Sequence, residues 1–183
     1  MSGAAYRRPT VATVVDRLQR SADMEEPNED TPGLTILNHG LQCAAHLRRS
    51  HPADAELQVA GLLHDVGHLL APGCEDIHGL VGAGYVRPVF GERVAALIEY
   101  HVPAKRYLVA TDGAYRALLS RGSVRTLAMQ HGPMTSGEAA AFAASPHFEA
   151  AVCLRRADES AKDPVAEVAS LDSWLSALLA VAG

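Results

Sequence analysis

The sequence predicts an all-α fold, and three observations support this class. Ala and Leu are abundant in the 183 residues, whereas aromatic residues make up only 5%. Runs of β-branched residues with a period of two, which indicate strands, are absent from the sequence. Apolar residues recur instead at helical spacing, as at Val11, Val14, Val15 and Leu18. A hydrophobic share of 48% is enough for one core, and the length fits a single domain over residues 1–183.

Breaker residues separate the expected helices in the first half of the chain. An acidic loop with two prolines, residues 24–33, follows the first helix. A His-Pro pair at 51–52 and an Ala-Pro-Gly run at 71–73 end the second and third. Pro88 and Gly91 separate the fourth from the fifth. These five helices are expected over residues 10–20, 34–49, 53–70, 77–86 and 92–100.

Shorter helices are expected in the second half. Residues 102–109 are predicted to form a connector. After a turn at Gly132-Pro133-Met134, Thr135 can cap the next helix and form a capping box with Glu138. The expected helices cover residues 115–118, 124–130, 137–144, 147–158 and 170–181.

Charge and cysteine content exclude several classes of function. The 16 Lys and Arg against 21 Asp and Glu give a net charge of −5, which argues against a nucleic-acid binder. No apolar run reaches the ~18 residues of a membrane span, and no signal peptide opens the chain. The three cysteines are far apart and form no CxxC pair, as expected of reduced thiols in a cytoplasmic protein.

Histidine is the unusual residue, with nine in the chain, and one pair stands out. His64 and Asp65 are adjacent near the end of an apolar helix, where burial without a partner is costly. A divalent cation removes that cost, because imidazole and carboxylate together suit Zn, Fe, Mn or Ni. For an isolated His-Asp pair, a hydrogen bond that helps to end the helix is the simpler explanation. This pair is not isolated: further candidate ligands from other helical regions are His39, His78, His101 and Asp158.

The order of these six residues, H…HD…H…H…D, resembles the HD-domain superfamily in the version that holds two metal ions. The resemblance implies an all-α HD-domain helical bundle with a dinuclear metal site in its core. Asp65 would then bridge the two ions, with His39, His64 and Asp158 completing one site. The histidines at 78 and 101 would complete the other site.

Residues around the ligands resemble one branch more closely, the mixed-valent diiron oxygenases that degrade phosphonates. The resemblance covers residues 34–160, the expected catalytic core. It implies two iron ions (Fe2+/Fe3+), O2 and a phosphonate as partners, and a cytoplasmic dioxygenase of phosphonate catabolism. The expected reaction cleaves the C–P bond of 2-amino-1-hydroxyethylphosphonate, or a close analogue, to a carboxylate and phosphate. The matching stretches are residues 39–44 (HGLQCA), 62–68 (LLHDVGH), 101–109 (HVPAKRYLV), 132–138 (GPMTSGE) and 155–159 (RRADE).

The resemblance also implies roles beside the metals. Lys105 and Arg155 each lie about one helical turn from a ligand, and with His68 they would hold the phosphonate. Gln42 would order a hydrogen bond to a ligand or a substrate oxygen. Expected catalytic residues are His64, Asp65 and Lys105. Lys and Arg also commonly cap helix ends and face solvent, which is the alternative for both cations.

The chain departs from the resembled family in the acidic loop near the site. The family has a tyrosine and, three residues later, a glutamate before its first ligand histidine. The corresponding positions here are Glu29 and Pro32, and no tyrosine lies between Arg7 and Gly84. The sequence therefore leaves open which residues replace this pair. It also leaves open the group on the second carbon of the substrate, which could be an amine, a trimethylammonium or another group.

Two other functions are compatible with the six ligands. A dimetal HD phosphohydrolase would use Mn, Mg, Zn or Fe and hold the phosphate of a nucleotide or phosphomonoester with Lys105 and Arg155. A non-catalytic HD module would sense a metal or a ligand. The 101–109 stretch argues against the hydrolase, and the complete ligand set argues against the module. The sequence leaves the oligomeric state open.

Overall fold

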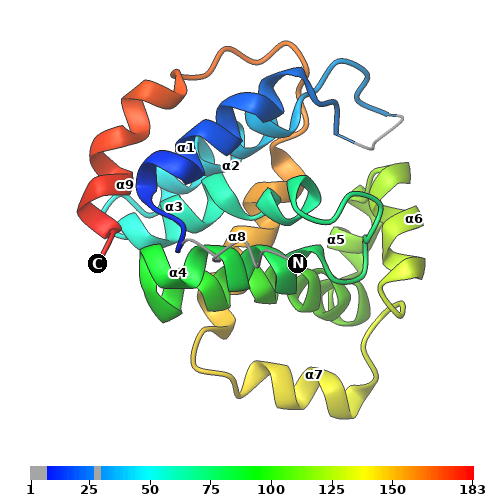
Figure 1. The fold of residues 1–183 in the computed structure, drawn as a ribbon. Helices are drawn as coiled ribbons and strands as arrows, with labels where there is room; N and C mark the ends of the chain where they lie inside the picture. The colour runs from blue at the N-terminus through cyan, green and yellow to red at the C-terminus, as the bar shows by residue number, and fades with distance from the viewer. Residues whose placement is uncertain (1–7, 27–29) are drawn as a thin grey trace, which may run out of the picture.

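The all-α prediction is confirmed. The computed structural model describes residues 8–26 and 30–183, in which a single β-bridge, between Glu25 and Thr35, accompanies the helices (Figure 1). The α-helices are α1 (Val11–Arg20), α2 (Ile36–Ser50), α3 (Ala55–Leu63), α4 (His78–Thr111), α5 (Gly113–Leu118), α6 (Arg121–Met129), α7 (Ser136–Ala143), α8 (Phe148–Ser160) and α9 (Leu175–Val181). Short 3-10 helices are η1 (Ser21–Asp23), η2 (Val66–Leu69) and η3 (Leu171–Trp174).

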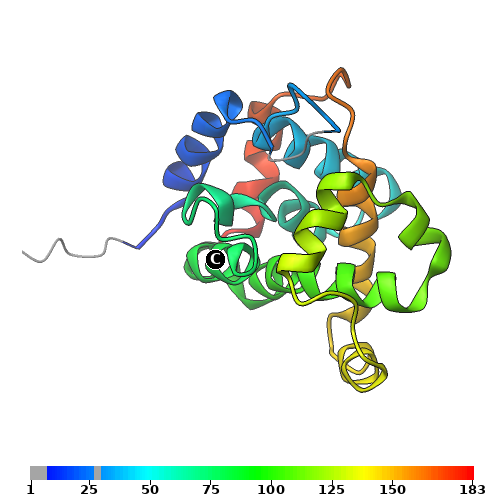
Figure 2. The same cartoon turned by 90° about the vertical axis from the view of Figure 1, so that its right-hand side faces the viewer.

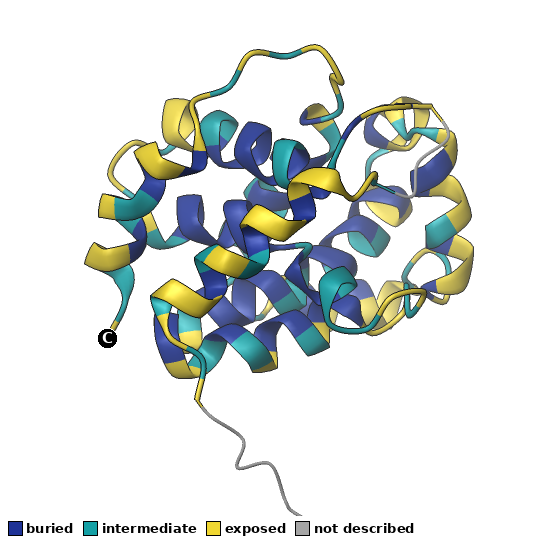
Figure 3. Cartoon of the chain, turned by 45° about the horizontal axis from the view of Figure 1, so that its top comes forward, coloured by how far each residue is buried: buried dark blue, intermediate teal, exposed yellow. Residues whose placement is uncertain are grey.

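Four helices form the centre of the molecule. Helices α2, α3, α4 and α8 pack against one another, and their facing sides are buried (Figure 3). Leu63, Leu97 and Leu154 are among the fully buried side chains of this core. Helix α9 covers α3, whereas α7 lies at the edge of the molecule, where it contacts α4 and α8 (Figures 1 and 2). The six candidate metal ligands all come from these central helices and the turns that follow them.

The predicted helix over 53–70 is wrong in its second half. Helix α3 begins after Asp54, whose side chain accepts a hydrogen bond from the Leu57 N–H, and it ends at Leu63. The His64 ring then bonds the Gly61 carbonyl, and Asp65 leaves the helical region with φ −98° and ψ 9°. The chain turns here into η2, so the two side chains leave the end of α3 toward the centre of the bundle.

The predicted break around Pro88 and Gly91 is only partly right, and the predicted connector at 102–109 is wrong. Helix α4 runs to Thr111 with one interruption at Gly91, whose φ of 80° is the left-handed region that favours glycine. Residues 102–109 continue the helix through Pro103. Proline usually breaks a helix, because it has no backbone N–H and its ring clashes with the preceding turn. This explains why the sequence predicted a connector here. Because the helix is continuous, Lys105 lies one turn after His101 on the buried side of α4.

Other predicted elements agree with the structure. Thr10 caps α1, and Thr135 forms the expected capping box with Glu138 at the start of α7. Among the described residues, no helix combines the length and the apolar character needed to cross a membrane.

Candidate metal centre

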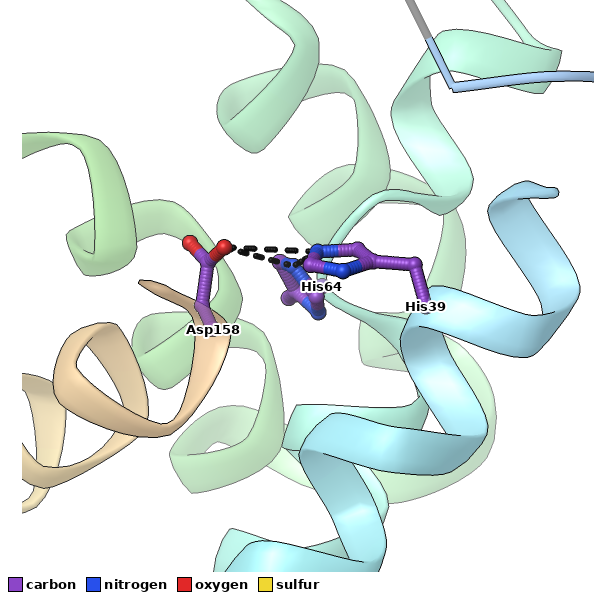
Figure 4. A group of neighbouring side chains, drawn as sticks. All are labelled: His39, His64 and Asp158. Atoms are coloured by element: carbon purple, nitrogen blue, oxygen red, sulfur yellow. Dashed lines mark hydrogen bonds and ion pairs between the residues drawn. The ribbon is translucent and has the colours of Figure 1, made fainter. Parts of the chain in front are cut away.

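Three predicted ligands from separate helices meet in the core of the bundle. His39 comes from α2, His64 from the end of α3 and Asp158 from α8, and all three are buried (Figure 4). His39 Nε2 lies 3.1 Å from His64 Nε2 and 3.3 Å from Asp158 Oδ1. The structure thus brings the first predicted set together.

Asp65 lies between this set and the other two predicted histidines. Its Oδ2 atom is 3.6 Å from His39 Nε2 and 3.4 Å from His64 Nε2. Its Oδ1 atom is 3.6 Å from His78 Nε2 and 3.8 Å from His101 Nε2. One carboxylate oxygen therefore faces each histidine pair, which is the arrangement expected of a bridging ligand.

The histidine tautomers fit a pair of cations. Each Nδ1 lies within hydrogen-bond distance of a backbone carbonyl, at 2.8 Å for His39, His64 and His78 and 2.5 Å for His101. In the neutral form of each ring, Nδ1 carries the proton and Nε2 presents a lone pair. Yet His78 Nε2 is only 2.8 Å from His101 Nε2 and has no hydrogen to share with it. Facing lone pairs repel, and a cation between them removes the repulsion. Such spacing matches two adjacent ligands on one ion at roughly 2.1 Å.

The two halves of the centre differ in charge. Burial lowers the pKa of His39, but Glu26 and Asp158 outweigh burial and raise it to about 9. In the other half, burial and the neighbouring His68 lower the pKa of His78 to about 4. Burial, together with His78, holds the pKa of His101 well below its ordinary value. The second pair is therefore neutral and ready to bind metal at pH 7, whereas His39 must release its proton.

A cavity opens beside these ligands and is lined by both signs of charge. Lys105, Arg155 and Lys162 contribute cations, and Glu26 and Glu75 contribute carboxylates in addition to Asp65 and Asp158. Lys105 Nζ donates to Thr126 Oγ1 at 2.6 Å and to Gln130 Oε1 at 2.8 Å. Burial, and next the charge of Arg155, lower the pKa of Lys105 to about 7. Both predicted phosphonate-holding cations therefore lie at the cavity that the metal ligands border.

The other two predicted substrate residues have different surroundings. His68 also lines the cavity; its ring stacks on His78 with centroids 4.1 Å apart, and its Nε2 is 3.8 Å from Asp65 Oδ1. Because ligand atoms of His68, Asp65 and His78 lie within 4.8 Å of one another, His68 is also a candidate ligand. Gln42 instead bonds the backbone of Asp163 at both amide atoms, at 2.7 and 3.2 Å.

Several cavity residues were not found by sequence reasoning. Glu26 is the best defined of them. Its backbone N–H donates to the Leu34 carbonyl at 2.8 Å, next to the β-bridge between Glu25 and Thr35. Glu26 Oε2 is buried, lies 3.9 Å from His39 Nδ1 and makes no hydrogen bond with the described residues. Glu29, which stands at the position of the family's tyrosine, lies outside the described residues. The sequence pointed to the acidic loop at 24–33 as a whole, in which Glu26 is one of several carboxylates, and did not single it out. The remaining unforeseen residues are Glu75, Ser123, Thr126, Gln130 and Lys162.

Comparison with known proteins identifies the family. The model of the myo-inositol oxygenase family matches residues 3–101, more than half of the chain. The chain belongs to this family of HD-domain non-heme diiron oxygenases. Within the family, it is 40% identical to hydroxymethylphosphonate dioxygenase of Gimesia maris over 77% of the chain and 74% of the relative.

Two further relatives match different shares of the chain. The chain is 33% identical to [1-hydroxy-2-(trimethylamino)ethyl]phosphonate dioxygenase (glycine-betaine-forming) of Leisingera caerulea, over 77% of the chain and 74% of the relative. It is 36% identical to inositol oxygenase of Bos taurus, over 44% of the chain and 27% of that protein. The phosphonate dioxygenases thus match far more of the chain.

Proposed function

We propose that the chain uses two iron ions (Fe2+/Fe3+) and O2 to cleave the C–P bond of a 1-hydroxyphosphonate. The substrate is 2-amino-1-hydroxyethylphosphonate or a close analogue, and the products are a carboxylate and phosphate. One observation carries the proposal: the histidine and aspartate cluster shares a cavity with the buried cations of Lys105 and Arg155. The names of the two phosphonate dioxygenase relatives support the same substrate class.

The six residues of the cluster would hold the iron. His39, His64 and Asp158 form one ligand set, the histidines at 78 and 101 form the other, and Asp65 joins them. The iron pair, when bound, would supply the redox chemistry that activates O2. Nitrogen and carboxylate ligands suit iron, and the family membership favours iron over zinc or manganese.

The chain's own contribution is to bind and orient the phosphonate. Lys105 and Arg155 offer N–H donors to a phosphonate dianion, and burial strengthens such charge-assisted bonds. Hydroxyl groups of Ser123 and Thr126 line the same cavity, but they donate to Glu159 Oε2 at 2.9 Å and to the Ser123 carbonyl at 3.3 Å, so the two cations supply the donors to the phosphonate. Because the cations sit beside the ligand cluster, the C1 hydroxyl of a bound phosphonate would point toward the metals.

Glu26 supports a substrate with a cationic group on its second carbon. A buried carboxylate oxygen without a hydrogen-bond partner is costly, and a positive ligand group would offset that cost. The cavity thus offers cations for a phosphonate and a carboxylate for an ammonium group. This arrangement favours an aminophosphonate over hydroxymethylphosphonate, which has no second carbon.

Oxygen dependence tests the proposed function directly. The iron-loaded protein is incubated with hydroxymethylphosphonate, 2-amino-1-hydroxyethylphosphonate and its trimethylammonium analogue, with and without O2, and released phosphate is measured. We expect phosphate only with O2, one O2 consumed for each phosphate, and no activity in metal-free protein. Equal phosphate release without O2 would instead support the hydrolase, as would full activity with Mg2+ and a phosphomonoester.

A further inference from the structure

A buried tyrosine lies directly behind Arg155, on the side away from the metal ligands. Tyr115 is only 3% exposed, and its hydroxyl accepts a hydrogen bond of 2.7 Å from Arg155 Nε. The start of α5 holds this tyrosine, because Asp112 Oδ1 accepts from the Tyr115 N–H at 3.0 Å. Its ring packs with Leu108, Val109 and Leu127 in a small apolar cluster. Nothing in the sequence motifs pointed to Tyr115.

Arg155 is held on several sides. Besides the bond to Tyr115, one terminal nitrogen, Nη2, donates to Ser123 Oγ at 3.2 Å and to the Glu159 carboxylate. The other, Nη1, donates to Asp158 Oδ2. Four of the five N–H donors of the guanidinium are thereby engaged. The fifth, on Nη1, has no partner among residues 8–26 and 30–183 and is left for the cavity that Arg155 lines.

The contact with Asp158 links this network to the metal centre. Arg155 occupies Oδ2 of Asp158, while Oδ1 faces His39 Nε2 at 3.3 Å. The guanidinium therefore holds the orientation in which the Asp158 carboxylate faces the candidate metal. A planar guanidinium rotates as a unit, so fixing Nε also fixes the direction of both terminal nitrogens. Tyr115 is the partner that fixes Nε.

We propose that Tyr115 is a positioning residue that acts through Arg155 on the metal ligand Asp158 and on the N–H group offered to the substrate. Its hydroxyl touches neither metal nor substrate. This inference rests on the proposed metal centre, but it is independent of which phosphonate is cleaved. Outer hydrogen-bond partners of this kind typically change metal affinity by roughly 10- to 100-fold.

The substitution Tyr115→Phe tests the proposal, because it removes the hydroxyl and keeps the ring in its apolar cluster. Iron-loaded protein is mixed with a chelator, and the release of each of the two metals is followed by absorbance. We expect one metal, the one bound by Asp158, to leave about 10-fold faster, while the other is released at the wild-type rate. We also expect KM for the phosphonate to rise by about the same factor.

Tyr107→Phe is the matched control. Tyr107 contacts the same apolar cluster, and its hydroxyl takes part in no side-chain hydrogen bond found in residues 8–26 and 30–183. This variant should release both metals at the wild-type rate. Equal thermal midpoints of the two variants would show that the effect of Tyr115→Phe is not a loss of folding. Unchanged metal release and KM in Tyr115→Phe would overturn the proposal.

A double-mutant cycle separates positioning through Arg155 from a general effect on packing. Arg155→Lys keeps a positive charge but removes Nε and the fixed fork. If Tyr115 acts through Arg155, Tyr115→Phe should have no further effect on metal release in the Arg155→Lys protein. Additive effects would refute the route through Arg155. Wild-type protein that binds no paired metals would instead contradict the proposed function itself.

Discussion

A Cβ atom on Gly67 would lie 1.9 Å from the carbonyl oxygen of His78. Helix η2 therefore packs directly onto the first turn of α4, and this contact sets the separation between Asp65 and the second histidine pair. Asp65 Oδ1 is 3.6 Å from His78 Nε2 as a result. The distance between the two halves of the metal centre depends on a residue that binds no metal.

Gly67→Ala should push α4 away and weaken the second metal site. Overpacking of this kind costs roughly 1–3 kcal/mol in the free energy of unfolding, which urea denaturation measures. Metal analysis should show that one of two metals is lost. Gly84→Ala is the control, because Gly84 lies in α4 with no atom within 4 Å of an added Cβ. It should stabilise the protein by up to about 1 kcal/mol. Equal stability and metal content in both variants would contradict the argument.

Removal of Asp65 should differ from removal of Asp158. Asp65 faces both histidine pairs, so Asp65→Ala should abolish the spectrum of paired iron and lower the content of both metals. Of the two histidine pairs, Asp158 faces only His39 and His64, so Asp158→Ala should lower the occupancy of that site alone. Asp16→Ala, at an exposed ion pair on α1, is the control and should keep two metals. Loss of only one metal in Asp65→Ala would exclude the bridging role.

His68→Ala distinguishes a substrate residue from a ligand. We expect two bound metals and a KM for phosphonate raised by about 10-fold, because a hydrogen bond to a charged group is worth about 1.5–3 kcal/mol. His68 lines the cavity that Lys105 and Arg155 also line, which supports this expectation. Metal content and initial rates measure the two effects. A protein with one metal would make His68 a ligand, and His147→Ala should change neither quantity.

Glu26→Gln tests recognition at the far end of the substrate. Loss of the carboxylate charge should lower kcat/KM for the two phosphonates with a cationic group by roughly 10- to 100-fold, the value of a charge-assisted bond. Turnover of hydroxymethylphosphonate should change little. Glu25→Gln, at the exposed neighbour, should leave the preference among the three substrates as it is in the wild type. A parallel loss for all three, with metals lost, would assign Glu26 to the support of His39.

The sequence was most informative where residue type and function coincide. His39, His64, Asp65 and Asp158 were predictable because buried imidazole and carboxylate groups need a partner, and metal binding is a common solution. Helix limits were less predictable, since Pro103 has the local character of a breaker and only packing against the bundle keeps it in α4.

Residues that meet only through the fold were not predictable. Tyr115 and Arg155 are 40 positions apart, and their contact follows from the packing of α5 on the continuous α4. Glu26 is one of several acidic residues in its loop, and only the backbone bond to Leu34 selects it to face the core. Ordinary polar residues such as Thr126 and Gln130 likewise become part of the site only because Lys105 lies beside them.

Lys105 should give the enzyme two opposite pH dependences. Burial lowers its pKa from 10.5 to about 7, so between these values the unfolded chain binds more protons at this residue than the folded chain does. Stability therefore rises with pH across that window, by linkage. Lys105→Met removes this penalty, and it should be more stable than wild type at pH 7 in urea denaturation. The difference should shrink toward pH 10.

Phosphonate binding should follow the other direction. As pH rises through about 7, Lys105 in the free enzyme loses the charge that attracts the phosphonate, so kcat/KM should fall. Lys105→Arg is the control, because arginine stays charged and the ionisation of the substrate is common to both proteins. The kcat/KM of Lys105→Arg should stay level over the pH range in which that of the wild type falls. At low pH, its KM should be higher than the wild-type KM. Parallel profiles for the two proteins would show that another group controls binding. Lys105→Met should raise KM steeply at every pH and still bind two metals, because the proposed function assigns Lys105 to the substrate and not to a metal.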